Sequence, residues 1–339
     1  MENKTEIKKA NFDERVYFMG RNYSPFVKAV NSALSPLKKN DYAEKLKSFL
    51  LERSGLNKAV LFNSAEEAYY WTLRSIKGDD NAFPEGKRGE IIFLNQRLYD
   101  YVVPDIISTS NNIKCVKVDH VGNFISALSD KTAAVITELY SASGEKIYDK
   151  NFLAQISEIC SVRNIAFIID ERNNLPMATG EFFSFTEYGI QPDVVIAGGN
   201  FYRSFSLGAV LLGKKIKTPP AKREIGSVAC AGALALLEGA ASNMDVIKER
   251  AKRLRETLSI CKMVNSFCVF GLTGYADTAD GKTYAAAFKE KGLKVGVIED
   301  RIIFNLPVVM SEDEFSFGLK VIKDVLKGAQ NPFDMDKTD

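Results

Sequence analysis

Three segments between residues 167 and 209 decide how the rest of the chain is interpreted. They read FIIDERNN at 167–174, GEFFSFTEYGIQPDVVIAGGN at 180–200 and FSLGA at 205–209. Short apolar runs bounded by polar residues and glycines predict two buried strands joined by a loop. The first strand ends in a carboxylate, Asp170, and the second ends at Gly198, Gly199 and Asn200, which offer no reactive side chain. These segments therefore indicate an architecture more clearly than a chemistry.

Strands and helices alternate along the first two thirds of the chain. The expected strands are 58–62, 90–94, 114–118, 133–138, 166–170, 193–197 and 208–213, and the expected helices are 41–54, 66–77, 99–108 and 152–162. This alternation predicts a mainly parallel sheet with helices on both faces. Ligand sites in such sheets lie beyond the carboxyl ends of the strands, where Asn63, Glu138, Asp170 and Gly198 fall.

The remainder of the chain predicts a second, smaller unit. An alanine-rich stretch at 229–241 and a charged helix at 245–261 lead to strands at 266–271, 293–297 and 302–304 and helices at 283–291 and 312–327. We therefore predict a large α/β domain of residues 41–245 and a small α+β domain of residues 1–40 and 246–330. Residues 331–339 are expected to form a flexible tail.

Two helix boundaries are signalled by capping residues. Asp41 is a candidate N-cap for the helix that Gly55 ends, because a carboxylate accepts from free N–H groups and glycine adopts a left-handed conformation. Ser311, followed three residues later by Glu314, predicts a capping box for the final helix.

Composition excludes several classes of function. The 45 basic and 43 acidic residues nearly cancel, so we expect no binding of nucleic acid or of an anionic membrane surface. No apolar run approaches the roughly 20 residues that cross a bilayer, and the N-terminus lacks a signal-peptide core. The 5 cysteines are scattered without a CxxC pair, which favours a reduced, cytoplasmic protein. With His120 as the single histidine, a multi-histidine metal site is excluded.

The pattern from Asp170 to Val195 resembles that of a known family. The string DE-x7-TG-x2-F-x-F-x2-YG-x2-PD-x-V is similar to that of the class III aminotransferases, the acetylornithine and ornithine aminotransferase relatives among the fold-type-I pyridoxal phosphate enzymes. Residues 63–68 and 302–314 extend the resemblance, which covers about 41–326. It implies a fold-type-I architecture and a homodimer with active sites between subunits.

The resemblance can be carried over residue by residue to the cofactor's reactive groups. Asp170 matches the family's aspartate on the pyridine nitrogen, whereas the position of the Schiff-base lysine is Gly199. Pyridoxal phosphate chemistry needs both groups, because the lysine holds the cofactor and the acid makes its ring an electron sink. No lysine lies between Lys150 and Lys214, so a small error in register cannot supply one.

The other family positions are also altered. Ser64, Ala65 and Glu66 stand where the family binds phosphate, and Val228 stands where a neighbouring subunit supplies a threonine. The positions that flank the ring are Arg97 and Arg172, and Asn173 adjoins them, although Asn173 and Asn174 also suit a turn. On the substrate side, Ile303 replaces the carboxylate-binding arginine and Ser143 replaces a glutamate.

Each of these positions has an ordinary structural interpretation as well. Asp170 could be a strand-end carboxylate without a ligand, and Gly198–Gly199 could be a turn that cradles phosphate or only a turn. Arg97, Arg172 and Arg203 could form an anion pocket. Alternatively, they pair with Glu66, Glu171 and Glu138 and fill the cleft.

Three hypotheses for function follow. The preferred one is an aminotransferase-like protein that is degenerate for transamination and has a binding, regulatory or partner-subunit role. It is expected to hold no pyridoxal phosphate, or to bind it noncovalently, and to form a homodimer or to pair with an active paralogue. The alternatives are an active pyridoxal phosphate-dependent aminotransferase of amino-acid metabolism and an enzyme that reuses the cleft for a small anionic substrate.

Overall fold

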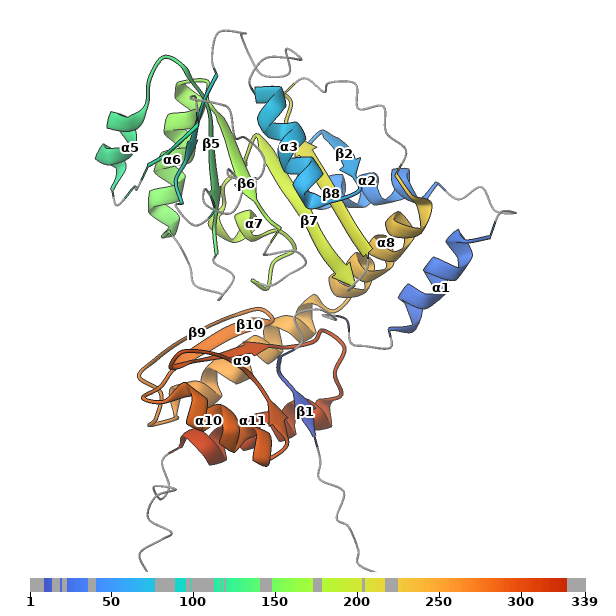
Figure 1. Cartoon of the computed structure of the whole chain (residues 1–339), viewed down its shortest axis with the longest axis vertical. Helices are drawn as coiled ribbons and strands as arrows, with labels where there is room; N and C mark the ends of the chain where they lie inside the picture. The colour runs from blue at the N-terminus through green and yellow to red at the C-terminus, as the bar shows by residue number, and fades with distance from the viewer. Residues whose placement is uncertain are drawn as a thin grey trace, which may run out of the picture.

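The computed structural model describes residues 9–13, 19, 23–35, 41–76, 89–95, 98, 113–116, 118, 120–140, 148–172, 179–202, 205–216 and 225–327. Within these ranges, a seven-stranded and a four-stranded sheet form the frameworks of two domains, one above the other in Figure 1. The carboxyl ends of the parallel strands in the larger sheet point toward the smaller domain. The fold therefore directs its strand-end site toward the junction of the two domains.

The larger sheet is mostly parallel. Its strands are, in spatial order, β2 (Lys58–Phe62), β8 (Phe205–Leu212), β7 (Val194–Tyr202), β6 (Ala166–Asp170), β5 (Thr132–Glu138), β3 (Glu90–Phe93) and β4 (Ile113–Cys115). Strand β8 is antiparallel to both of its neighbours, and each other described pairing is parallel. The predicted mainly parallel sheet is confirmed, with β8 as the reversed strand.

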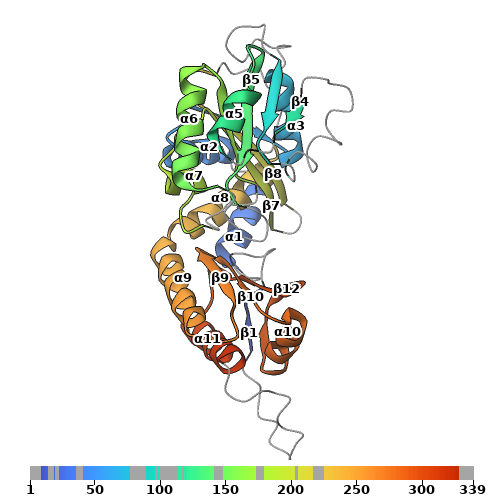
Figure 2. The same ribbon diagram turned by 90° about the vertical axis from the view of Figure 1, so that its left-hand side faces the viewer.

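Helices cover both faces of this sheet. They are α2 (Tyr42–Ser54), α3 (Ala65–Ile76), α5 (Val121–Ala127), α6 (Lys150–Val162), α7 (Ser184–Tyr188) and α8 (Ser227–Ala241). Figure 2 shows α3 on one side of the sheet and α2, α6, α7 and α8 on the other. The Asp41 carboxylate accepts from Glu44 N–H, and Gly55 ends α2 at φ 68°, as predicted.

Alternation of side chains along each strand divides the interior into two apolar cores. In β6, Phe167 and Ile169 join the core beneath α2, α6, α7 and α8, whereas Ile168 joins the core beneath α3. Successive residues of a strand point to opposite faces. Asp170 is therefore directed to the α3 face and Glu171, one residue later, to the α7 face.

The smaller domain packs helices on one face of an antiparallel sheet. Its strands are β12 (Gly296–Ile298), β13 (Arg301–Asn305), β10 (Thr273–Asp277) and β9 (Ser266–Phe270), and its helices are α9 (Met244–Ser259), α10 (Gly281–Glu290) and α11 (Glu312–Leu326). Helix α11 begins with the predicted capping box between Ser311 and Glu314. The apolar stripe of α11 packs with the sheet residues into the main core.

The N-terminal residues contact both domains. Strand β1 (Ala10–Asn11) pairs in parallel with β11 (Leu293–Lys294), and the ring of Phe12 stacks on Phe315 at 5.9 Å. Helix α1 (Ser24–Ala33) instead packs against α8 of the larger domain. The predicted domain bounds remain a prediction, with the N-terminal segment divided between the two units.

Two sequence-based boundaries differ from the structure or lie outside it. The predicted turn at Gly198–Asn200 is wrong, because β7 continues through these residues and pairs with β8 as far as Tyr202 and Phe205. A hairpin satisfies the backbone groups that a turn would expose. The helix predicted at 99–108 lies outside the described residues.

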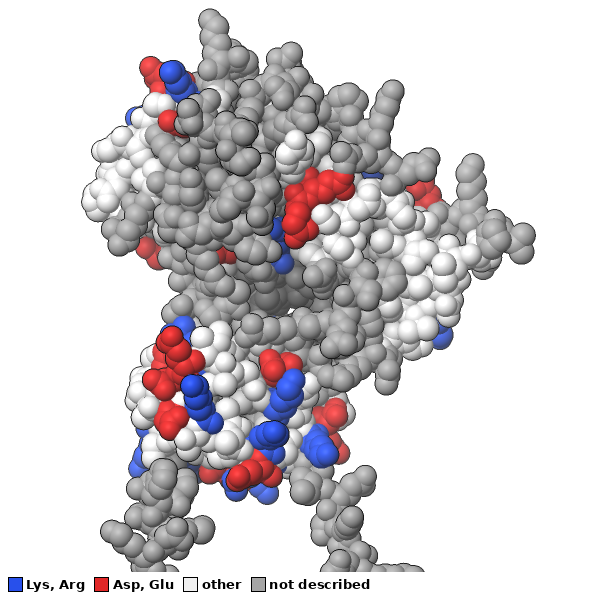
Figure 3. Space-filling model, in the orientation of Figure 1, with Lys and Arg blue, Asp and Glu red and all other residues white. Residues whose placement is uncertain are grey.

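The described surface and helices bear on association. Figure 3 shows acidic and basic side chains interspersed over the smaller domain, without an extended patch of one sign among the described residues on that face. Across the described ranges, no helix is long and apolar enough to cross a membrane. Nor do those ranges place three His, Cys, Asp or Glu side chains together as a metal site.

Candidate functional site

The candidate site lies where β5 and β6 end beside β7, near the first turn of α3. Glu138 and Asp170 are paired residues at the last rung between β5 and β6, and Asp170 is paired with Ile196 in β7. Both carboxylates are buried, at 3% exposure for Glu138 and 1% for Asp170. The parallel register therefore brings together the strand ends that the sequence predicted.

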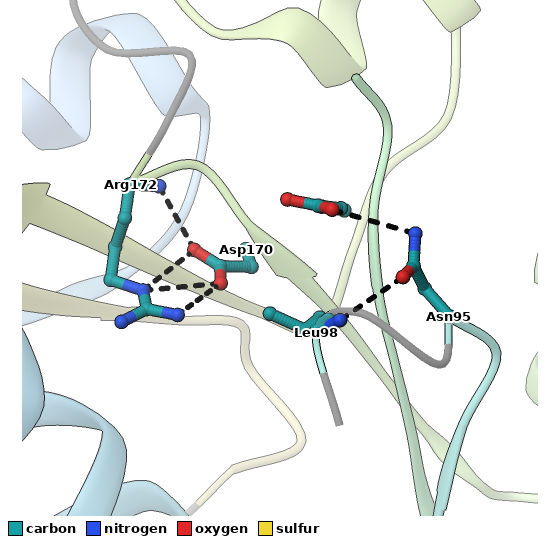
Figure 4. A network of polar contacts seen from close by, with 5 residues as sticks. Asn95, Leu98, Asp170 and Arg172 are labelled. Carbon is teal, nitrogen blue, oxygen red and sulfur yellow. Dashed lines mark hydrogen bonds and ion pairs between the residues drawn. The ribbon is translucent and has the colours of Figure 1, made fainter. Parts of the chain in front are cut away.

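The dominant interaction at this site is between Asp170 and Arg172. The Arg172 side chain turns back to its own strand end, so that Nε lies 3.0 and 3.1 Å from the two carboxylate oxygens. Its Nη2 donates to Oδ2 at 2.7 Å, and its backbone N–H donates to Oδ1 at 2.9 Å. Figure 4 shows this closed arrangement. Both oxygens of Asp170 are consequently occupied by one arginine.

Helix α3 completes the enclosure of the arginine. The guanidinium carbon of Arg172 lies 4.3 Å from the centre of the fully buried Tyr69 ring, which is cation–π geometry. Burial raises the pKa of the Tyr69 phenol, and the nearby charge of Asp170 raises it further. The Tyr69 hydroxyl has no hydrogen-bond partner among the described residues. The Tyr69 ring contacts the guanidinium, and its hydroxyl lies near the Asp170 carboxylate, which contributes to the raised pKa of the phenol.

The N-terminus of α3 is satisfied by its own side chains. Ser64 Oγ accepts from Glu67 N–H at 3.1 Å, and the Glu67 carboxylate accepts from Asn63 N–H at 3.0 Å. Ala65 is buried, while Glu66 is exposed. A helix N-terminus attracts anions through free N–H groups and its dipole. Here the Ser64 hydroxyl accepts from one N–H of the first turn, and Glu66 and Glu67 already place negative charge there.

Glycines in β7 and β8 bring the strands and α3 close together. A Cβ on Gly198 would lie 2.2 Å from Leu207 O, and one on Gly208 would lie 2.1 Å from Ser64 O. Gly199 is different, since its Cβ would meet a single atom, Arg172 O at 3.7 Å. Its φ of 131° nevertheless disfavours any side chain. The position that the resemblance assigns to the lysine thus has room for a side chain, but its backbone has a conformation that favours glycine.

A second polar chain lies beside the ion pair. Asn95 Nδ2 donates to Glu138 Oε1 at 3.4 Å, and Asn95 Oδ1 accepts from Leu98 N–H at 3.0 Å. Figure 4 shows Asn95 and Leu98 on the side of Asp170 away from Arg172. Glu138 therefore takes its hydrogen bond from an amide.

Glu171 occupies the opposite face of the sheet. It is fully buried, and its Oε1 accepts from Ser184 Oγ at 2.7 Å and from Phe185 N–H at 3.1 Å. Its Oε2 has no partner among the described residues. Burial raises the pKa of Glu171 from 4.5 to about 8, while the two hydrogen bonds oppose that shift. A fully buried carboxyl group without a cation is neutral near pH 7.

The structure describes only some of the residues that the sequence analysis assigned to the site. Arg172 does form an ion pair within the strand-end site, but its partner is Asp170. Pairing with Glu171 is wrong, because strand alternation turns the Glu171 side chain to the other face of the sheet. Ile303 is buried in β13 of the smaller sheet, paired with Tyr275 and Gly296. The candidates Arg97, Ser143, Asn173, Asn174 and Arg203 lie outside the described residues, and their roles stay predictions.

Tyr69 was not among the residues that the sequence analysis assigned to the site. The tyrosine is fully buried. A usable signal was its position four residues after Ala65, because residues i and i+4 share one face of a helix. That face of α3 is the one that meets the end of β6.

Sequence comparison with known proteins relates the chain to aminotransferases. The family profile described as Aminotransferase class-III matches residues 94–326. The acetylornithine aminotransferase of Methanocaldococcus jannaschii is 24% identical over 296 residues, covering 80% of this chain and 74% of that protein. The acetylornithine aminotransferase of Caldanaerobacter subterraneus is 22% identical over 315 residues, covering 85% and 80%.

Solved structures share the architecture. An ornithine aminotransferase from Toxoplasma gondii superposes with a TM-score of 0.77 at 17% identity, covering 94% of this chain and 86% of that one. The acetylornithine aminotransferase from Elizabethkingia anophelis gives 0.73 at 19% identity, covering 94% and 88%. The predicted fold-type-I architecture is confirmed.

Proposed function

Because the chain belongs to the class III aminotransferase family, we propose that it is an aminotransferase-like protein whose strand-end site no longer performs transamination. Its role is then that of a binding, regulatory or partner subunit. The observation that carries the proposal is the Asp170–Arg172 ion pair, which uses the acid that the family resemblance assigns to the cofactor ring. The substituted lysine position, Gly199, supports it.

The described residues do not fit a covalently held pyridoxal phosphate. A Schiff base needs a lysine, and residues 151–213 contain none. An acid that activates the pyridine nitrogen needs an accessible oxygen, and Arg172 covers both oxygens of Asp170. A phosphate dianion needs unsatisfied donors and is repelled by nearby carboxylates. The first turn of α3 carries two carboxylates, Glu66 and Glu67. Three separate requirements are therefore unmet.

The Asp170–Arg172 ion pair offsets the cost of burying the Asp170 carboxylate. A buried carboxylate without a positive partner carries a large desolvation cost. In a cofactor enzyme, a protonated pyridine ring can supply that partner. Here the Arg172 guanidinium supplies it from within the chain, stacked on Tyr69. Asp170 thus has a positive partner without any cofactor.

Absorbance and mass measurements test the proposal directly. The purified chain is titrated with pyridoxal phosphate near stoichiometric concentration, then reduced with borohydride and analysed by peptide mass mapping. We expect no saturable aldimine absorbance band and no stoichiometric adduct at a single lysine. Scattered, substoichiometric adducts on surface lysines count as background. A stoichiometric adduct at one lysine would overturn the proposal and establish the active-enzyme alternative.

Two engineered changes make a negative result interpretable. Gly199→Lys restores an amine at the family's lysine position, and Gly199→Ala is its matched control, since both substitutions impose the same backbone strain at φ 131°. Combined with Arg172→Val, which uncovers Asp170, the lysine variant should gain a reducible adduct that the alanine variant lacks. Equal behaviour of the two would argue that Gly199 does not occupy the lysine position.

The active-enzyme alternative rests on the family itself. Its relatives are named acetylornithine aminotransferases, and the present chain shares their fold and the aspartate at the end of β6. Under this alternative, the wild-type chain should transfer an amino group from an amino-acid donor when supplied with pyridoxal phosphate. The idea that the cleft serves a small anion is less favoured, because Arg172 is already paired with Asp170.

The proposal includes a homodimer or a pairing with an active paralogue in the cytoplasm. The family resemblance and the scattered, reduced cysteines support these assignments. Light scattering coupled to size exclusion measures the mass of the purified chain, which should be twice 37.6 kDa for the homodimer. Native mass measurement after pull-down from the host separates the homodimer from a mixed dimer.

A further inference from the structure

A cavity of about 370 Å³ lies between the two domains and shares no lining residue with the Asp170–Arg172–Tyr69 cluster. The larger domain contributes Tyr140, Thr179–Glu181 and Glu187, and the smaller domain contributes Lys248 and Arg255 of α9 together with Cys268 of β9. Its volume is at the lower end of the range of small-molecule sites, roughly 300–1,000 Å³. We call it the interdomain cavity.

One cation of the interdomain cavity is not neutralised. Arg255 Nη2 donates to Val269 O at 2.7 Å, and its remaining N–H groups make no hydrogen bond or ion pair with any described residue. Lys248, in contrast, is bridged across the domain junction to Glu181 at 2.8 Å. An arginine fork without a carboxylate partner is suited to bind a ligand carboxylate in two-point geometry.

The opposite wall carries negative charge. Glu187 lines the cavity and accepts a hydrogen bond from the Tyr140 hydroxyl, whose pKa is raised by burial and then by that bond. Glu181 lines the same wall and shares its charge with Lys248. Two cationic and two anionic side chains therefore surround one small volume, so a ligand of zero net charge with separated charges suits it.

An additional polar group is left unsatisfied at this wall. Thr179 is 7% exposed, and its hydroxyl has no hydrogen-bond partner among the described residues. Leaving a buried hydroxyl unpaired costs about 1–3 kcal/mol. Native proteins usually pair such groups with protein, water or ligand. The Thr179 oxygen is itself buried, so it adds polarity to this wall without offering a contact to an occupant.

We propose that the interdomain cavity binds a small zwitterion, namely a free amino acid whose carboxylate pairs with Arg255 and whose ammonium group faces Glu187. This site is separate from the strand-end site and does not depend on whether that site transaminates. Because the lining comes from both domains, a bound zwitterion adds contacts across the junction. The ligand therefore favours the arrangement of domains seen here over any that separates α9 from residues 179–187.

The cavity contains its own reporter, the partly exposed thiol of Cys268. The wild-type chain is treated with iodoacetamide with and without glycine or L-alanine, and alkylation of each cysteine is followed by peptide mass mapping. We expect saturating zwitterion to slow alkylation of Cys268 several-fold and to leave the other cysteines unchanged. Acetate and methylamine, which each carry one of the two charges, should protect much less.

Variants assign the effect to the arginine. Arg255→Gln should abolish protection of Cys268, and Arg255→Lys, which keeps the charge without the fork, should retain part of it. The matched control is Arg253→Gln on the same helix, because Arg253 pairs with Glu312 outside the cavity and should not affect protection. Absence of protection by either amino acid, equal protection by acetate, or unchanged protection in Arg255→Gln would each overturn the proposal.

Discussion

Asp170 and Glu171 are consecutive carboxyl groups at the end of one strand, yet different interactions stabilise them in the protein interior. Asp170 is paired with the Arg172 fork on the α3 face, and its Oδ2 lies 2.7 Å from Nη2. Glu171 on the α7 face has hydrogen-bond donors but no cation among the described residues, and its pKa is raised to about 8. One charge is cancelled by a guanidinium and the other by a proton. The difference shows that strand alternation, rather than local sequence, assigns each carboxyl group its chemistry.

The largest effect is expected from breaking the ion pair. Arg172→Leu leaves Asp170 buried without a cation, and removal of one partner of a buried pair costs about 3–5 kcal/mol. The midpoint of urea unfolding measures this loss. In the double variant Asp170→Asn, Arg172→Leu, most of the stability should return, since no uncompensated charge remains. Equal losses in the single and double variants would show that packing of the arginine, not its charge, matters.

The pH dependence tests the neutral state of Glu171. Its folded pKa of about 8 is above its ordinary value of 4.5, so the folded chain holds the proton more tightly than the unfolded chain. The resulting stability is fully present below about pH 4.5 and is lost as pH rises toward 8. Unfolding free energy should fall by on the order of 1 kcal/mol per pH unit between pH 5 and 7.5.

Glu171→Gln is the comparison for that slope. The amide is neutral at every pH and can still accept from Ser184 and Phe185. In this variant, residue 171 should therefore add nothing to the pH dependence of the unfolding free energy over the same range. Glu158→Gln, on the exposed part of α6, should keep the wild-type slope. Identical slopes in all three proteins would contradict a protonated Glu171.

A smaller effect is expected from removing one donor to Glu171. Ser184→Ala deletes the hydroxyl that lies 2.7 Å from Oε1, at a cost of about 1 kcal/mol. Because that bond favours the ionised carboxylate, its loss should also move the pH-dependent fall to higher pH. Ser126→Ala, an exposed serine that donates to Gly122 O, should change stability by less than about 0.5 kcal/mol.

The smallest effect is expected at Tyr69. Tyr69→Phe keeps the ring under Arg172 and removes a buried hydroxyl without a partner, so stability should stay within about 0.5 kcal/mol of wild type. Tyr140→Phe is the contrast, since that hydroxyl donates to Glu187 and its loss should cost about 1–2 kcal/mol. A loss for Tyr69→Phe as large as that for Tyr140→Phe would show that the phenol is bonded to Asp170.

Much of the fold was predictable because its signals are local. The alternation of apolar strands and helices predicted the parallel sheet, and Asp41, Gly55 and Ser311 marked helix ends through their own backbone hydrogen bonds. The strand-end position of Asp170 followed from the same pattern. The turn at Gly198–Asn200 was wrong because paired glycines suit both a turn and a strand against a close neighbour. The deciding contact, with Leu207 O, comes from another strand.

The composition of the site was less predictable than its position. One interpretation of the sequence set Arg97, Arg172 and Arg203 against Glu66, Glu171 and Glu138, whereas Arg172 pairs with Asp170 because residues i and i+2 at a strand end share one face. Tyr69 entered the cluster only through the packing of α3 on β7 and β8. Nothing in the sequence indicated the interdomain cavity, since its two walls come from segments about 60 to 130 residues apart.

The sequence by itself determined the order of strands and helices, the class III resemblance, the acid at the end of β6 and the absence of a lysine at Gly199. These depend on residue type and spacing, which are fixed along the chain. The tertiary structure alone decided that Arg172 covers both oxygens of Asp170, that Glu171 is buried without a cation among the described residues, and that Arg255 lines a cavity without a carboxylate partner in the same part of the chain. Each of these depends on which surfaces meet, because burial and long-range contacts set the energy of a charged group more strongly than its neighbours in sequence.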